Sequence, residues 1–283
     1  MEYIKEINNI IAKTDSLIKN LFFSLSPIYK DQFGIDQDAA VFLFTTLHST
    51  SESILILLLN QAIFDADVLL RTVMEGTAKY CYLMTGSKQE RHDKYMEYKY
   101  KLTEIDKLLD HFKAIETIKI LKKYSSNSTK PFELSVLTEN EANQLKSLYP
   151  AKVRNEIKGR WSYQSLLRSL ADTHPEYKAQ LGSFSTYSLT SHFGHFDWTG
   201  VSMRESQIMS SSNEDDIIFD VAHAIRIASN LLSFYIFRVS EYMRGNNIGI
   251  SRTAELSMET ITYIDELINM ENIIIESVAD EDI

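Results

Sequence analysis

The sequence has few of the residues that interrupt helices, with only 9 glycines and 4 prolines in 283 residues. Turn-rich β folds need more of both, because these residues set the backbone angles of tight turns. Its single cysteine, Cys81, excludes an intramolecular disulfide and a zinc site built from several cysteines. Hydrophobic residues make up 44% of the chain, enough for one large core or two small ones. These features predict an all-α fold, and the scarcity of cysteine fits a reducing, cytoplasmic location.

Signals for secretion or membrane insertion are also missing. The first residues, MEYIKEINNIIAKTD, lack the basic-then-apolar layout of a signal peptide. A transmembrane helix needs about 18 uninterrupted apolar residues. The longest apolar stretch is interrupted at Glu52, Asn60, Gln61, Asp65 and Asp67. We therefore expect no membrane-spanning segment.

Apolar residues recur at the helical period along most of the chain, which predicts a multi-helix bundle. Helices are expected over residues 1–24, 39–60, 62–84, 88–124, 139–148, 163–171, 177–195, 216–244 and 252–275. Loops are expected over 26–37, 125–133 and 200–215, where polar residues, glycine and proline concentrate. We predict a single helical domain over 1–283, in which 88–150 is a peripheral insertion and 276–283 a frayed acidic tail.

The expected helix over 62–84 and the segment before it are almost wholly apolar, yet a charged pair lies near the middle of this helix. Residues 54–84 read ILILLLNQAIFDADVLLRTVMEGTAKYCYLM, with Arg71 and Glu75 four positions apart. A helix that is apolar on most sides is normally buried. A buried charge must be paired, because removing an isolated charge from water is very costly. The pattern predicts a desolvated ion pair in the core and makes Arg71 and Glu75 candidate functional residues.

A second polar cluster lies far downstream, in the segment YSLTSHFGHFD over residues 187–197. Tyr187, Ser191 and His195 are spaced at four-residue intervals, which places them on one face of a helix. Two hydroxyl groups and an imidazole can bind a phosphate or take part in acid–base chemistry. The same residues can instead satisfy buried hydrogen bonds.

The net charge of −10 excludes nonspecific nucleic-acid binding through the overall field of the protein. A local basic segment remains a candidate for such a contact. It contains Lys152, Arg154, Lys158 and Arg160, with Trp161 following as a stacking surface. We list these five residues as candidate RNA-binding residues. The alternative is an ordinary basic helix end followed by a loop.

The Arg71-x3-Glu75 motif and the downstream Tyr187-x3-Ser191-x3-His195 motif together resemble a bacterial all-helical family of unknown function. The resemblance covers roughly residues 39–201. That family is distantly similar to HEPN domains, helical bundles found in toxin and antiviral defence systems. Many HEPN proteins are ribonucleases that need no metal and work as dimers. The resemblance implies a HEPN-like fold, an RNA substrate, a homodimer and no cofactor.

HEPN ribonucleases use an arginine and a histidine that are separated by four to six residues, with a polar residue directly after the arginine. The one segment with this spacing is Arg168-SLADT-His174. Ser169 follows the arginine, where Asn, Asp or His is more usual in HEPN ribonucleases, and Pro175 follows His174 directly. Pro175 places His174 at a helix boundary rather than inside a helix.

Alternatively, Arg71 and His195 meet in space and perform the same chemistry. Arg71 would then stabilise the pentacoordinate phosphate, and His195 would move the proton of the 2′-hydroxyl. Glu75 would orient Arg71, while Tyr187 and Ser191 would hold the scissile phosphate. These five residues are our candidate catalytic set.

Two other classes of function stay open. The first is a non-catalytic helical module that binds a protein partner or a small ligand, in which the polar residues fix the register of the helices. The second is a metal-dependent helical enzyme, although the paired Glu-x-x-His motifs of di-iron bundles are absent. Its potential ligands are His48, Glu52, Glu75, His192, His195 and Asp197. We expect no metal.

Overall fold

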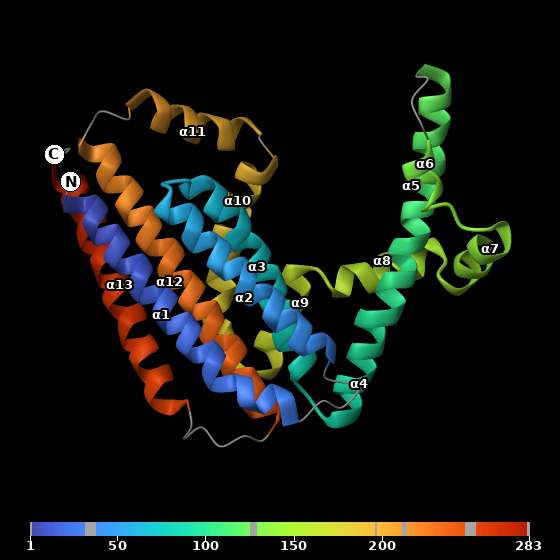
Figure 1. Cartoon of the computed structure of the whole chain (residues 1–283), viewed down its shortest axis with the longest axis horizontal. Coiled ribbons are helices and arrows are strands. Elements are labelled where there is room, and N and C mark those ends of the chain that lie inside the picture. The colour runs from blue at the N-terminus through green and yellow to red at the C-terminus, as the bar shows by residue number, and fades with distance from the viewer. Residues whose placement is uncertain are drawn as a thin grey trace. The chain divides into compact units, whose positions relative to one another are not determined.

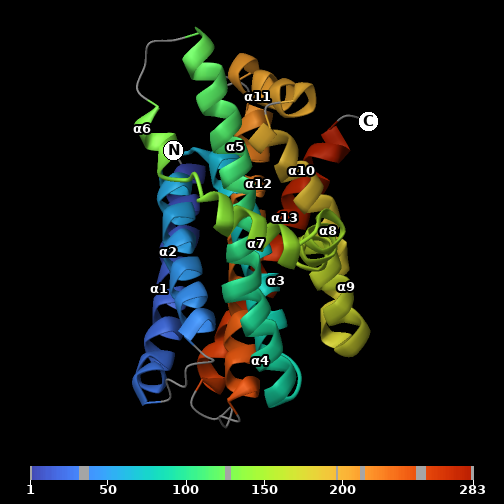
Figure 2. The same cartoon turned by 90° about the vertical axis from the view of Figure 1, so that its right-hand side faces the viewer.

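The computed structural model describes residues 2–31, 38–124, 129–195, 197–210, 214–246 and 253–281, and every regular element among them is helical (Figures 1 and 2). In chain order the elements are α1 (Glu2–Asp31), α2 (Asp38–Leu59), α3 (Ile63–Met84), α4 (Lys88–Met96), η1 (Glu97–Lys101), α5 (Leu102–Tyr124), α6 (Lys130–Glu133), α7 (Glu139–Leu148), α8 (Ala151–Arg160), α9 (Tyr163–Thr173), η2 (Pro175–Gly182), α10 (Ser183–His195), α11 (Trp198–Ser210), α12 (Glu214–Gly245) and α13 (Ala254–Glu281). The predicted all-α class is confirmed.

The chain divides into two compact units. Unit 1 comprises Met1–Thr85 and Leu166–Ile283, and unit 2 comprises Gly86–Ser165. Unit 2 includes the whole of the predicted insertion at 88–150 and extends through α8.

The core of unit 1 is organised around α12, which contacts α1, α2, α3 and α13. Figure 1 shows α1, α12 and α13 running side by side. The apolar side chains that are completely buried in this core include Ile18, Leu21, Phe44, Ile54, Leu70, Met74, Ile225, Leu231 and Leu232. Each such side chain contributes about 1.5–3 kcal/mol by leaving water, which is why helices of modest intrinsic propensity are stable here.

Helices α2 and α3 approach closely at Gly76. A Cβ atom at this position would lie 2.3 Å from Cδ2 of Leu47. Leu47 is itself only 2% exposed and has little room to move aside. Glycine therefore permits this close packing of α3 against α2, and a larger residue would force Leu47 to shift.

One helix of the described residues, over Ala39–Leu59, is long and apolar enough to cross a membrane by length and composition alone. It belongs to α2, which packs against both α1 and α3. Its inward side carries His48, which accepts or donates a hydrogen bond at 3.0 Å from the Tyr235 hydroxyl of α12. One side of α2 is thus buried against its neighbours, whereas Phe42, Ile56 and Leu59 of the same helix are exposed.

Unit 2 is built on a long helical run in which α4, the π-helical turn η1 and α5 follow one another without a break. Ser87 and Glu90 form a capping box at the start of α4. Farther along, the backbone N–H of Leu137 donates to Nδ1 of His111 at 3.0 Å and ties the segment before α7 to α5. The buried apolar residues of unit 2 include Tyr95, Ile105, Leu108, Ile157 and Trp161.

The helix boundaries differ from the predictions at several places. The predicted loop at 200–215 is wrong, because α11 spans Trp198–Ser210. The cause is a cap: the carboxylate of Asp197 accepts a hydrogen bond at 3.2 Å from the backbone N–H of Gly200. The predicted helix at 177–195 is instead a 3₁₀ helix, η2, followed by α10.

Two terminal predictions also need correction. Helix α1 continues to Asp31 rather than ending at residue 24, and the remainder of the predicted loop, 32–37, lies outside the described residues. Helix α13 continues to Glu281, so most of the predicted frayed tail at 276–283 has helical backbone. Amphipathic periodicity did not reveal these last turns, because helix ends extend beyond the residues they bury.

Cys81 provides a direct test of this packing. The side chain is 1% exposed, and burial raises the pKa of its thiol to about 12. A buried protonated thiol is unreactive, because the thiolate is the nucleophile. We expect no reaction with Ellman's reagent at pH 8 in the native protein and one equivalent in 6 M guanidinium chloride. Rapid reaction of the native protein would show that α3 is not packed as described.

Candidate functional site

Helices α3 and α10 pack antiparallel and carry the residues of the candidate site. Phe193 near the end of α10 meets Phe64 near the start of α3, with ring centroids 4.7 Å apart. Tyr187, earlier on α10, reaches Arg71 and Glu75 farther along α3. The residues of α10 that face inward, Thr190 and Phe193, are 1% and 2% exposed.

The structure brings Arg71, Glu75 and Tyr187 into one hydrogen-bonded cluster, which we call the Arg–Glu–Tyr cluster. Arg71 Nε donates to Glu75 Oε1 at 3.3 Å, and Arg71 Nη2 donates to the Tyr187 hydroxyl at 3.0 Å. The same hydroxyl donates to Glu75 Oε1 at 2.7 Å. The guanidinium also lies over the tyrosine ring, 4.5 Å from its centroid. Each member therefore orients the other two.

The cluster is less buried than the sequence predicts. The side chains of Arg71 and Glu75 are 24% and 34% exposed, so the expected desolvated core pair is instead a partly exposed one. The reason is that Leu70, Val73 and Met74 turn the buried face of α3 toward α12 and α2, while Arg71 and Glu75 lie at its margin. Helix α10 covers this margin only in part.

The tyrosine of the cluster is held in its protonated form. Burial and the hydrogen bond to the Glu75 carboxylate raise the pKa of Tyr187, and Arg71 opposes them only in part. Tyr187 thus remains a proton donor at and well above neutral pH. A carboxylate acceptor, a proton donor and a guanidinium consequently lie within hydrogen-bonding distance of one another.

The other two members of the predicted catalytic set do not join the cluster. Ser191 lies on the same helix, but no hydrogen bond among the described residues links it to Arg71 or Glu75. His195 is the exposed last residue of α10. It stands eight residues beyond Tyr187, about 12 Å along the helix axis. The predicted meeting of Arg71 with His195 is not present in this structure.

The histidine near the end of α10 that has a hydrogen-bond partner is His192, whereas the sequence pattern favours His195. Its Nδ1 lies 2.5 Å from Oδ2 of Asp197, the residue that caps α11. The hydrogen bond with His192 and the backbone N–H of Gly200 lower the pKa of Asp197. Gly200 is needed at this corner, because a Cβ there would lie 2.4 Å from the carbonyl oxygen of His192.

The potential metal ligands are dispersed. No three His, Cys, Asp or Glu side chains of the described residues lie close enough together to hold one ion. His48 and Glu52 are 3.8 Å apart on α2, but His48 also stacks on Phe22 with ring centroids 4.0 Å apart. The described residues therefore do not assemble the set of ligands that a metal-dependent helical enzyme needs.

Arg168 and His174, the pair with HEPN-type spacing, face different partners. Helix α9 ends at Thr173, and His174 has extended backbone before η2, as Pro175 predicted. Nδ1 of His174 lies 3.4 Å from Nη1 of Arg244. The guanidinium of Arg168 is exposed and lies 5.8 Å from the centroid of the Phe184 ring.

The predicted RNA-binding residues lie in unit 2, and most of them have internal partners. Arg160 forms a bidentate pair with Glu97, and Lys158 pairs with Asp106 at 2.9 Å. Trp161 is 5% exposed and donates its indole N–H to Glu97 at 2.9 Å, so its ring offers no stacking surface. Burial opposes ionisation of Glu97, but the hydrogen bonds from Arg160 and Trp161 prevail and lower the pKa of Glu97.

The remaining two predicted residues differ in their surroundings. Arg154 donates to the carbonyl oxygen of Tyr149 at 2.7 Å, which leaves other N–H groups of its guanidinium available. Lys152 is exposed on α8.

Sequence reasoning missed a line of polar residues along α12. Arg238 is completely buried, donates to the Thr77 hydroxyl at 2.7 Å and lies 4.6 Å from the centroid of the Tyr235 ring. Glu241, 3% exposed, accepts from the Tyr177 hydroxyl at 2.6 Å and pairs with Arg244. The argument applied to Arg71, a charge in an apolar helix, would have found Arg238 as well.

The start of α12 carries another missed pair. His223 Nε2 lies 2.5 Å from Oδ2 of Asp67, which is completely buried on α3. Arg226 lies 4.0 Å from the same oxygen. On α13, burial raises the pKa of Glu271, and Arg226 and His223 reduce this effect. These contacts join α3, α12 and α13.

Fold and site together define an all-helical protein with a partly exposed Arg–Glu–Tyr cluster between two antiparallel helices. The chain belongs to a family of unknown function (DUF5677), whose model matches residues 37–215. No curated protein and no solved structure matches the chain significantly. All three residues of the cluster lie inside the matched range, whereas α13 and almost all of α12 lie outside it.

The two arginines on apolar helices should differ in their contribution to stability. We expect Arg71→Ala to lower the free energy of unfolding by about 1 kcal/mol or less, because it belongs to a partly exposed ion pair. Arg238→Ala should cost about 3 kcal/mol or more, because it leaves a cavity and an unsatisfied Thr77 hydroxyl. Urea denaturation followed by circular dichroism measures both. Equal losses would show that Arg71 has a mainly structural role.

Proposed function

We propose that the protein is an RNA-directed, HEPN-like endoribonuclease that needs no metal, with the Arg–Glu–Tyr cluster as its active site. The observation that carries the proposal is the state of Arg71. Two of its five N–H groups are directed to Glu75 and Tyr187. The other three have no hydrogen-bond partner among the described residues, and the side chain is 24% exposed. A guanidinium held in a fixed orientation with free donors is well suited to bind a phosphate.

The cluster contains each group that cleavage of an RNA strand requires. Glu75 takes the proton of the 2′-hydroxyl, and the 2′-oxygen forms a bond to the adjacent phosphorus. Arg71 stabilises the negative charge that develops on the non-bridging oxygens. As the bond from phosphorus to the 5′-oxygen breaks, Tyr187 gives its proton to that oxygen.

The hydrogen bond between Tyr187 and Glu75 restores the starting state. At 2.7 Å, it allows the proton taken up by Glu75 to return to Tyr187. The products are a 2′,3′-cyclic phosphate and a free 5′-hydroxyl. This scheme gives the proton-accepting role to Glu75 instead of His195, because His195 is exposed at the far end of α10.

The test is cleavage of a synthetic single-stranded RNA by purified protein in the presence of EDTA. We expect Arg71→Ala and Glu75→Gln each to lower the rate by about 100-fold or more, in line with the loss of a transition-state donor or a general base. His195→Ala should retain the wild-type rate. Mass spectrometry should identify the cyclic phosphate end.

Arg204 offers a matched control. Its side chain is 26% exposed and, like Arg71, it links α3 to a neighbouring helix, through a 2.9 Å contact with Asp65. Arg204→Ala should leave cleavage unchanged. Loss of activity in this variant to the same extent as in Arg71→Ala, or an inactive wild-type protein, would contradict the proposal. Growth arrest on expression of the wild type but not of Arg71→Ala would further connect cleavage to a toxin or defence role.

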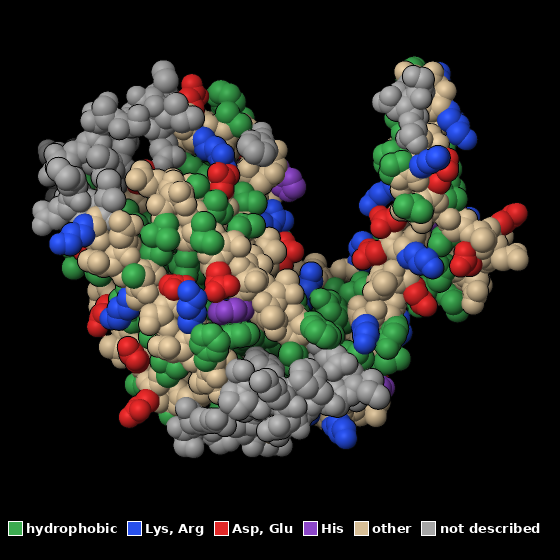
Figure 3. Space-filling model, in the orientation of Figure 1, with side chains coloured by type: hydrophobic (Ala, Val, Ile, Leu, Met, Phe, Trp, Pro, Cys, Tyr) green, Lys and Arg blue, Asp and Glu red, His purple; other side chains and the backbone are tan. Residues whose placement is uncertain are grey.

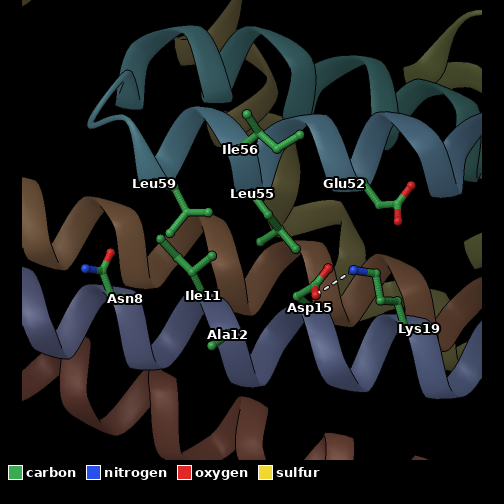
Figure 4. Close-up of a pocket in the computed structure, with 9 residues that line it drawn as sticks. All are labelled: Asn8, Ile11, Ala12, Asp15, Lys19, Glu52, Leu55, Ile56 and Leu59. Carbon is green, nitrogen blue, oxygen red and sulfur yellow. Dashed lines mark hydrogen bonds and ion pairs between the residues drawn. The ribbon is translucent and has the colours of Figure 1, made fainter.

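A second candidate function, a ligand-binding helical module, is favoured by a groove in unit 1. The groove lies between α1 and α2 and has a volume of about 480 Å³ (Figure 4). Ile11, Leu55 and Leu59 line its apolar part, and Asp15 and Lys19 pair at 2.8 Å at its other end. If this groove is the functional site, a bulky substitution such as Ala12→Trp will abolish function in the cell, and Arg71→Ala will not.

A further inference from the structure

The whole-chain charge conceals a strong asymmetry between the two units. Unit 2 holds 16 of the 29 Lys and Arg residues but only 11 of the 39 Asp and Glu residues, a net charge of +5. Unit 1 holds the remaining 13 basic and 28 acidic residues, a net charge of −15. The net charge of −10 therefore excludes little about unit 2, whose own field attracts polyanions.

The basic side chains near the start of α5 are largely neutralised within unit 2. Glu97 pairs with Lys101 and Arg160, and Asp106 pairs with Lys158. The excess positive charge is consequently found elsewhere in the unit, toward the end of α5.

Three lysines there share one turn-and-a-half of the helix. Lys119, Lys122 and Lys123 are all exposed, and the spacing of three and four residues places them next to one another. No acidic side chain of the described residues pairs with any of them. The ammonium of Lys123 lies 4.8 Å from the centroid of the Tyr124 ring.

The positive surface continues from these lysines toward α7 and α8. Phe112 lies seven residues before Lys119, two helical turns back along a similar side of α5. Lys146 of α7 lies over the Phe112 ring at 5.3 Å, and Arg154 of α8 lies over the same ring at 5.9 Å. Phe112 thereby holds two further cations close to α5. Figure 3 shows Lys and Arg side chains along α5, with Asp and Glu side chains among them.

We define Lys119, Lys122, Lys123, Lys146 and Arg154 as the basic track. From residue 112 to residue 123, α5 extends about 16 Å. Aromatic side chains stand beside one end of the track: Tyr124 is 72% exposed and Phe132 of α6 is 38% exposed. Exposed rings beside a row of cations are the features with which proteins bind single-stranded nucleic acid.

We propose that unit 2 is a nucleic-acid-binding module in which the basic track binds the phosphate backbone of single-stranded RNA. A membrane surface fits less well. Helices that lie in a membrane interface separate one apolar face from one charged face. On α5, the exposed Ile115 and Ile120 lie on different sides of the helix, with Lys119 and Lys123 between them.

This inference deepens the proposed function by naming where the substrate binds, and it rests on that function only for the identity of RNA as substrate. Binding and cleavage can be measured separately, so that either can fail alone. Glu75→Gln should lower the rate of cleavage by about 100-fold or more and leave RNA binding by the basic track intact. Loss of the basic track should weaken binding.

The experiment measures fluorescence anisotropy of a labelled 20-nucleotide single-stranded RNA with the full-length protein over a range of salt concentrations. The variant is Lys119→Ala/Lys122→Ala/Lys123→Ala, whose exposed helical alanines should preserve folding. At 0.1 M salt each phosphate contact contributes a factor of about five through counterion release, so the variant should bind on the order of 100-fold more weakly. The slope of log K against log salt should fall by about 2.

The control replaces three exposed lysines of unit 1, Lys5→Ala/Lys13→Ala/Lys178→Ala, and removes the same total charge. It should bind RNA with nearly the wild-type affinity and slope. Equal weakening in control and variant, or unchanged binding in the variant, would overturn the proposal. The proposal would also be overturned if the wild-type protein did not bind RNA at 50 mM salt but bound phosphatidylserine vesicles. The same holds if it did not bind RNA and light scattering showed an oligomer that the triple lysine variant does not form.

Discussion

The structure of unit 1 depends on the burial of α12. Its apolar residues pack against α1, α2, α3 and α13. The same helix carries Arg238, whose charged side chain is completely buried within this packing. A buried guanidinium is tolerated because the Thr77 hydroxyl accepts its hydrogen bond and the rings of Tyr235 and Phe44 lie against it. These directional contacts fix how α3 is rotated about its own axis. That rotation decides which residues of α3 reach α10.

The candidate site is a consequence of this rotation. The buried face of α3 packs in the core, so Arg71 and Glu75 lie at the margin of this face. There they form hydrogen bonds with Tyr187 of α10. The cluster is only partly exposed to solvent, and this has two effects. Burial of Tyr187 is sufficient to raise its pKa, and the exposed part of Arg71 and Glu75 is accessible to a ligand. A fully enclosed cluster would only join helices, and a fully exposed one would be screened by salt.

Helical periodicity was sufficient to predict the all-α class, the boundaries of α3 within one residue and the whole of α7. It also marked Arg71, Glu75 and Tyr187, three residues 116 positions apart at most, which the fold brings together. Periodicity could not tell which neighbour covers each side of a helix. For that reason the exposure of Arg71 was predicted wrongly, and Trp161, expected to be a surface ring, is a core residue bonded to Glu97. The cap at Asp197 was hidden for a similar reason, because polar residues around it imitate a loop.

The close contact at Gly76 has a further consequence for how the site is maintained. Gly76 follows Glu75 directly, so a residue of the cluster stands next to a position where α3 lies very close to Leu47 of α2. A side chain at residue 76 would press on Leu47 of α2, and a shift of α3 that relieved this contact would also move Glu75 relative to Tyr187 of α10. The spacing of α2 and α3 at Gly76 therefore helps to set the position of Glu75 in the cluster, although Gly76 itself contributes no functional group.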